Sequence, residues 1–336
     1  MAKTAKWFKR MGTGALGLVL AASLAACGSG KEGTGAATSS TQPTAQSSAS
    51  PGASSPAASP KTGQTAYPLT IKDATGTDVV FEKAPERVTT LVPSETEIVF
   101  AIGAGDKIAG VDKFSDYPAE AKSKPQIGDM NANLEALLAT KPDLVLASAS
   151  MNKKTVDQLR ELKIKVFASD PKTVDEVMDK ITTVGKIMNM ADGAKKVTDK
   201  MREEKQKVTD AVKNAPKKKV YMEFSPGWTV GKGEFMDELV SLAGGDNVAH
   251  EQAGWNKIDP EKIIKSNPEV ILYAKGESGM SSILDEIKKR PGFEAIDAMK
   301  NNKVYAIDSN KVARVGPRLT EALTDMAKAI HPDLVK

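Results

Sequence analysis

From about residue 67 onward, the apolar side chains follow two different periods along the chain. Short apolar runs predict buried strands, and apolar residues three or four positions apart predict helices. Strands are predicted at residues 69–72, 79–81, 87–92, 108–111, 144–147, 165–167, 220–224, 270–273 and 304–307. Helices are predicted at residues 95–102, 134–139, 156–162, 174–188, 192–212, 235–243, 260–265, 283–289 and 319–330. Ser94 and Glu97 fit a capping box at the start of the first helix. The alternation of predicted strands and helices along the chain predicts an α/β fold with mostly parallel sheets covered on both faces.

The predicted helix at residues 192–212 differs from the others because it is highly charged and has few apolar residues. At 1.5 Å per residue it would be about 31 Å long. A long polar helix between two α/β segments indicates a strut between two lobes, residues 67–190 and 214–336, with residues 191–213 as the interlobe helix. The alternative is a surface helix of a single domain.

The two predicted lobes contain one pattern in common. Asn133 and Asp259 each precede a helix with a glutamate in its first turn, Glu135 and Glu261. Each glutamate lies seven residues before a proline that opens an apolar strand. An acid at a helix N-terminus is favourable to the helix dipole, which is a sufficient structural explanation. The repetition also places a matched pair of negative charges on the two lobes.

Before residue 67 the pattern changes completely. A basic start and an apolar run at residues 16–22 end in Leu24-Ala25-Ala26-Cys27, which predicts a secretory signal at residues 1–26. The tetrapeptide resembles a bacterial lipobox, in which the cysteine carries the lipid. A transmembrane helix is the alternative, but the run is too short to cross a bilayer. Residues 27–66, rich in Gly, Ser, Ala and Pro, predict a disordered tether.

Charge and cysteine content narrow the function further. The net charge is +4 from 47 basic and 43 acidic residues, mostly interleaved, which does not favour a nucleic-acid partner. The single cysteine, assigned to lipid, leaves no intrachain disulfide and no thiol nucleophile. No G-x-S-x-G nucleophile elbow occurs, and we expect no enzyme activity. The two histidines, His250 and His331, cannot form a multi-histidine metal site. His331 is expected to be solvated.

Six segments resemble the substrate-binding proteins of cobalamin and ferric-siderophore ABC importers: residues 87–97, 115–118, 141–145, 231–238, 254–255 and 316–319. The resemblance implies two α/β lobes joined by one long helix, the class III periplasmic-binding-protein fold, with ligand held between the lobes. It also implies a monomeric lipoprotein on the extracytoplasmic face of the cell membrane. Its partners would be an ABC permease dimer with ATPase subunits, and it would need no cofactor of its own.

The same resemblance assigns roles to individual residues. Ligand-binding positions are expected at Tyr117, Trp228, Lys232, Trp255 and Arg314. Loops at strand ends are where ligands bind in such sheets. For the tryptophans the alternative is core packing, and for Lys232 and Arg314 an ordinary surface position.

Two further implications concern the partner and the ligand. Glu135 and Glu261 match the glutamates that dock into arginine pockets of the permease. Residues 129–131 and 148–150 lack the tryptophans found in well-known cobalamin binders. This difference leaves room for another corrinoid or for a ferric chelate. From the resemblance as a whole we favour cobalamin or another corrinoid, with a ferric siderophore as the alternative ligand.

Overall fold

The computed structural model describes residues 64–275 and 283–336. The predicted signal, Cys27 and nearly all of the predicted tether lie outside these residues, so those predictions stay untested. Of the two units into which the chain divides, residues 1–57 and 58–336, only the second contains described residues. No helix in the described ranges is long and apolar enough to cross a membrane.

The first sheet of this unit is entirely parallel, in the strand order β4-β3-β5-β6. Its strands are β3 (Val88–Thr90), β4 (Ile108–Val111), β5 (Leu144–Ser148) and β6 (Val166–Ser169). Its helices are α1 (Pro93–Ala101), α2 (Leu134–Ala139), α3 (Lys153–Glu161) and α4 (Val174–Ile187). An antiparallel hairpin of β1 (Leu69–Lys72) and β2 (Asp78–Phe81) precedes it. Alternate residues of β5 belong to different hydrophobic clusters, so both faces of this sheet are covered.

The second sheet is also parallel, in the strand order β12-β11-β7-β9. Its strands are β7 (Lys218–Glu223), β9 (Gly245–Asn247), β11 (Val270–Lys275) and β12 (Val304–Asp308). The helices are α6 (Phe235–Leu242), α7 (Pro260–Ser266), α8 (Ile283–Lys289), α9 (Asp297–Lys300), α10 (Ser309–Ala313) and α11 (Leu319–Ile330). Two short strands, β8 (Trp228–Val230) and β10 (Trp255–Lys257), form a separate antiparallel pair. In the sequence β8 follows β7 and β10 follows β9. The sequence analysis did not predict this pair.

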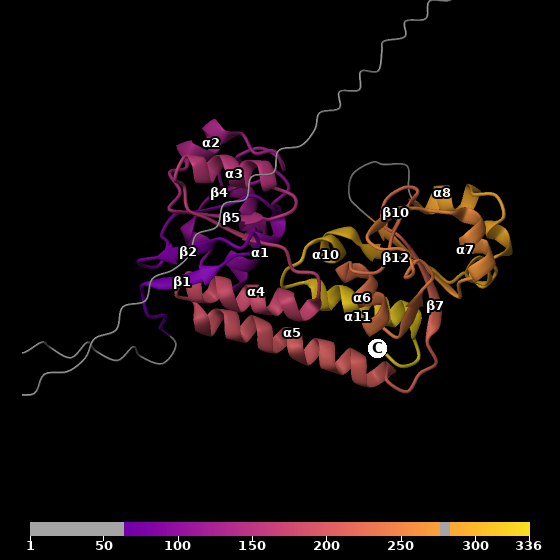
Figure 1. Ribbon diagram of the computed structural model, residues 1–336. Helices are drawn as coiled ribbons and strands as arrows, with labels where there is room; N and C mark the ends of the chain where they lie inside the picture. The colour runs from indigo at the N-terminus through magenta and orange to yellow at the C-terminus, as the bar shows by residue number, and fades with distance from the viewer. Residues whose placement is uncertain (1–63, 276–282) are drawn as a thin grey trace, which may run out of the picture. The chain divides into compact units, whose positions relative to one another are not determined.

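The helix α5 (Ala191–Val212) connects the two sheets and packs against helices of both lobes. Figure 1 shows it running along α4 and then along α11, and these are its main packing partners. Met201 of α5 belongs to one hydrophobic cluster together with Ile181 of α4 and Leu323 of α11. The predicted fold, two α/β lobes joined by one long helix, is confirmed. The exact lobe limits given above stay a prediction.

The predicted start of α1 is wrong. The helix begins at Pro93, with Val92 at the N-cap and no side chain capping it. Proline is favoured at the first helical position because its missing N–H has no partner there in any case. Ser94 is therefore a buried residue inside the helix, and Glu97 is free to bond elsewhere.

Candidate functional site

A cavity of about 470 Å³ lies between the two lobes. On the first lobe it is lined by residues 92–95, 148, 150–151 and 169–172, which lie at or just beyond the carboxyl ends of β3, β5 and β6. On the second lobe it is lined by Phe224, directly after β7, by residues 313–315 at the end of α10, and by residues 234–236 and Trp255. The carboxyl ends of parallel strands from both sheets thus face one space, the usual position of ligand sites in open α/β sheets.

One wall of the cavity is aromatic. The ring of Trp255 meets that of Phe224 edge to face, with centroids 5.4 Å apart. Trp255 keeps 43% of its surface exposed, so much of the indole is available to a ligand. Phe235 and Met236 add further apolar surface on the same lobe, and Met151 adds some on the first lobe. The wall therefore suits a bulky ligand with an apolar face.

The opposite wall is polar and its charges are paired. Glu95 Oε1 accepts hydrogen bonds from Lys180 Nζ at 3.0 Å and Ser169 Oγ at 2.8 Å. The side chains of Lys180 and Glu95 are only 4% and 2% exposed. Asp170 accepts from Ser150 Oγ at 2.8 Å and lies 3.5 Å from Lys172 Nζ. This wall offers hydroxyl groups and compensated charges.

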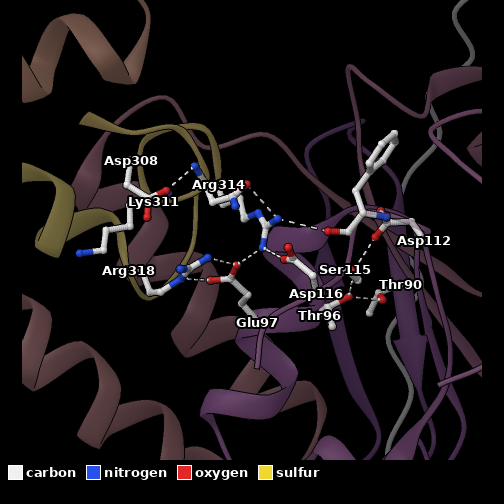
Figure 2. A network of polar contacts seen from close by, with 12 residues as sticks. Thr90, Thr96, Glu97, Asp112, Ser115, Asp116, Asp308, Lys311, Arg314 and Arg318 are labelled. Carbon is white, nitrogen blue, oxygen red and sulfur yellow. Dashed lines mark hydrogen bonds and ion pairs between the residues drawn. The ribbon is translucent and has the colours of Figure 1, made fainter. Parts of the chain in front are cut away.

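A buried cluster of charges joins the lobes beside the cavity (Figure 2). Glu97, on α1 of the first lobe, accepts from Arg314 Nη1 at 2.8 Å and from Arg318 Nη2 at 2.7 Å through Oε1. Its Oε2 accepts from Arg318 Nε at 2.9 Å. Both arginines belong to the second lobe. We call this group of three residues the Glu97 clamp.

Further groups of the first lobe surround the clamp. Arg314 Nη1 also lies 2.7 Å from Asp116 Oδ1, an ion pair whose angle falls outside the range of a hydrogen bond. The guanidinium of Arg318 stacks on the ring of Tyr117, 4.0 Å from its centroid. Burial disfavours the charged form of Arg318, but the hydrogen bonds and charge of Glu97 outweigh it and raise the pKa of Arg318. Arg318 therefore keeps its positive charge at any physiological pH.

Asp112 stands at the end of a hydroxyl chain behind the clamp. Thr90, Thr96 and Ser115 are linked in series through their hydroxyls, and Ser115 Oγ donates to Asp112 Oδ2. Burial raises the pKa of Asp112, although the bonds from Ser115 and Phe114 and the charge of Arg314 act in the other direction. This series of hydroxyl groups orders the loop that carries Phe114. The backbone carbonyl of Phe114 accepts a hydrogen bond from Arg314 Nη2 at 3.2 Å.

The predicted ligand-binding residues fall into two groups. Trp255 and Arg314 line the cavity, although the guanidinium of Arg314 is already engaged by the clamp. Tyr117 lines a different cavity of about 480 Å³, formed by α1, α5 and α11. Trp228 and Lys232 are not among the described residues of the cavity wall. Their predicted contacts with ligand stay predictions.

Sequence reasoning missed Glu95, Lys180 and Phe224. Phe224 lies directly after β7 and Glu95 in the first turn of α1, the helix that follows β3, and this proximity to the carboxyl ends of strands could have identified them. Lys180 lies in the middle of α4, where a lysine ordinarily faces solvent, and no local signal marks it.

The predicted pair of exposed glutamates has the expected local structure. Glu135 and Glu261 are exposed in the first turns of α2 and α7. The side chain of Asn133 caps the first helix and that of Asp259 caps the second, as predicted. Within the described ranges neither glutamate forms an ion pair. Both carboxylates are thus available to a partner.

The prediction for His331 is wrong. The residue is 4% exposed, and its Nε2 lies 3.0 Å from the carbonyl oxygen of Gly244. The end of α11 packs against the second sheet there, which buries a position that looks terminal in the sequence. His250 Nδ1 pairs with Asp237 Oδ2 at 2.9 Å. In the part of the chain that the structure describes, no three His, Cys, Asp or Glu side chains gather so as to hold a metal ion.

The sequence profile of a periplasmic binding protein family matches residues 88–311, which span both lobes. The chain belongs to this periplasmic binding protein family. The resemblance stated from the sequence is thereby confirmed at the level of the family.

Several known proteins are similar to this chain. The chain is 35% identical over 280 residues to the ABC transporter substrate-binding lipoprotein YvrC of Bacillus subtilis, covering 80% of this chain and 88% of the relative. It is 27% identical over 276 residues to a cobalamin-binding protein of Halobacterium salinarum, covering 79% and 75%. A possible iron-binding, periplasmic solute-binding protein of Staphylococcus epidermidis superposes with a TM-score of 0.66 at 34% identity, covering 74% of this chain and 100% of that one.

Proposed function

We propose that this protein is the substrate-binding lipoprotein of an ABC importer and captures a metal chelate, cobalamin or another corrinoid, between its lobes. The observation that carries the proposal is the cavity of about 470 Å³ at the carboxyl ends of the strands of both sheets. Its volume lies within the ~300–1,000 Å³ range of small-molecule sites. The relatives named as an ABC transporter lipoprotein and a cobalamin-binding protein support it.

The chemistry of the two walls favours a corrinoid. A corrin has broad apolar faces and a rim of neutral carboxamides. The faces suit the aromatic wall of Trp255 and Phe224, and the amides suit the hydroxyls of Ser148, Ser150 and Ser169. The alternative ligand is a ferric siderophore, which the possible iron-binding protein of Staphylococcus epidermidis supports.

Delivery requires partners that the fold itself does not contain. Substrate-binding proteins of ABC importers work with a permease and its ATPase subunits, and the family serves transport rather than catalysis. Under this proposal the lipid on Cys27 holds a monomer at the extracytoplasmic face of the membrane. Glu135 and Glu261 then present one carboxylate from each lobe to arginines of the permease, a pairing that is selective in geometry.

Calorimetric titration of the full chain with cyanocobalamin tests the capture step. We expect saturable binding with one ligand per chain, and a loss of tenfold or more in affinity for Trp255→Ala, about 1.4 kcal/mol or more. Trp228→Ala is the matched variant, because it removes the same side chain from the paired strand of the same small sheet. An equal loss in both variants would place Trp228 at the ligand as well.

The alternative ligand has its own outcome in the same titration. Binding of a ferric hydroxamate without any response to cyanocobalamin would replace the corrinoid with a siderophore. No binding of either class would contradict capture of a metal chelate.

A further inference from the structure

Every cationic side chain on the described wall of the cavity is matched by a carboxylate of the same chain. The three are Lys172, Lys180 and Arg314. Lys180 lies 3.0 Å from Glu95, Lys172 lies 3.5 Å from Asp170, and Arg314 lies 2.8 Å from Glu97. None of the three offers an uncompensated positive charge to a ligand.

Together with the charged residues directly behind it, the wall of the cavity has slightly more carboxylates than cationic side chains. Glu234 also lines the cavity and has no ion pair among the described residues. Asp116 shares Arg314 with Glu97, although Arg318 adds a positive charge behind the wall. An anion entering the cavity would lose its hydration and meet charges that are already neutralised. Desolvation without a compensating partner is costly.

We propose that the cavity selects chelates without net negative charge and rejects polyanionic ones. The inference rests on the proposed capture of a chelate in this cleft and specifies its class. Accepted ligands present amides, hydroxyls or a positive charge, as corrinoids and ferric hydroxamates do. Rejected ligands are ferric complexes of catecholates or carboxylates, which carry several negative charges.

Glu95 is the specificity-determining residue in this arrangement. Its Oε1 accepts from both Lys180 and Ser169, and the pair is buried in the wall itself. A charge interaction in so dry a position is stronger than at the surface. Glu95→Gln keeps the shape of the side chain and removes its charge, which leaves Lys180 as a buried cation beside the cavity.

The experiment compares three probes by calorimetric titration of the full chain: cyanocobalamin, neutral ferrichrome and triply negative ferric enterobactin. We expect the unaltered protein to bind at least one neutral probe about a hundredfold more tightly than ferric enterobactin, since a trianion would lose its hydration without meeting a compensating partner. Glu95→Gln should raise affinity for ferric enterobactin about tenfold or more. The gain should shrink as salt is added.

Matched variants separate the charge of Lys180 from other effects. Glu95→Gln combined with Lys180→Gln removes both charges and should lose the gain. Glu203 is an exposed acid on α5 away from the cavity, so Glu203→Gln should leave the affinity for all three probes unchanged. Should Glu95→Gln fail to fold, Asp170→Asn frees Lys172 and must shift affinity in the same direction.

The outcomes distinguish this inference from the proposed function. Binding of ferric enterobactin by the unaltered protein as tightly as the neutral probes would overturn the charge selection and leave capture in the cleft intact. A gain for ferric enterobactin that persists in the double variant would also overturn it. Binding of no probe at all would overturn the proposed function itself.

Discussion

At the scale of single residues, Glu97 does more than its sequence context indicates. Its carboxylate is 2% exposed and accepts three hydrogen bonds from two arginines, Arg314 and Arg318. Charge-assisted, bidentate pairs of this kind are stronger than neutral hydrogen bonds. Because Glu97 and Arg314 are buried and Arg318 is partly buried, however, much of this attraction offsets the cost of removing the charges from water. The main consequence is that removing one residue of the Glu97 clamp leaves the remaining charges without their partner, which is costly.

We therefore expect Glu97→Ala to destabilise the protein by about 3–5 kcal/mol, since it leaves the buried Arg314 and the partly buried Arg318 without their shared partner. The midpoint of urea unfolding measures this. Asp157→Ala is the control, because its ion pair with Lys153 is exposed on the surface and is worth about 0.5 kcal/mol or less. Equal, small effects of the two substitutions would show that the lobes are not held by the clamp.

The clamp also shows where prediction from sequence fails. Ser94 and Glu97 have the spacing of a capping box, and nothing local argues against that interpretation. Glu97 instead bonds to side chains 217 and 221 residues away. A single sequence contains no signal that pairs such distant charges.

At the scale of elements, hydrophobic periodicity predicted nearly all of the larger helices and strands. The strand Ile108–Val111 and the helices Leu134–Ala139, Ile283–Lys289 and Leu319–Ile330 have the predicted ends. The strands β8 and β10 were missed because each has only three residues, too few to show an apolar period. Their pairing depends on contacts with each other, which local sequence does not reveal.

The seat of α5 on α1 depends on one glycine. Gly193 lies in the first turn of α5, and a Cβ atom there would overlap the carbonyl oxygen of Ile102 at the end of α1. In an open helix, alanine is more favourable than glycine by ~1 kcal/mol. Here the close approach of the two helices reverses the expected sign.

We expect Gly193→Ala to destabilise the protein by about 1–3 kcal/mol, as overpacking does in a close-packed interior. Thermal and urea unfolding of the two proteins would measure the difference. Lys196→Ala, at an exposed position one turn further along α5, should change stability by less than about 0.5 kcal/mol. A higher unfolding midpoint for Gly193→Ala would mean that the helices do not approach so closely.

At the scale of the whole folded unit, the proposed function divides capture and docking between two surfaces, the cavity and the exposed glutamates. Sequence reasoning located Trp255 and Arg314 at the cavity but missed the pair Glu95–Lys180. That pair brings α1 and α4 together, so it exists only once the lobe has folded. The exposed positions of Glu135 and Glu261 in the first turns of capped helices could be predicted because the two lobes repeat one local pattern. A local pattern that occurs twice can be seen in the sequence, whereas two distant residues that meet only in the folded protein cannot.

The division of tasks predicts that docking and capture can be separated. Glu135→Lys and Glu261→Lys each reverse an exposed charge in the first turn of a capped helix, so we expect only local effects on the fold. Against arginines of a permease, each reversal replaces attraction by repulsion. Uptake of labelled cyanocobalamin by cells that depend on this protein should fall to background in the double variant. Calorimetric affinity for the ligand should stay within about twofold, because rim charges distant from a site contribute little.

Asp192→Lys provides the matched control for this experiment. It reverses another exposed acid in the first turn of a helix, α5, which has no counterpart in the repeated pattern of the two lobes. Uptake should therefore survive Asp192→Lys. If that variant abolishes uptake as completely as the double variant, general surface charge governs docking. If the double variant weakens ligand affinity instead, the two glutamates belong to the capture step and their proposed contact with the permease is wrong.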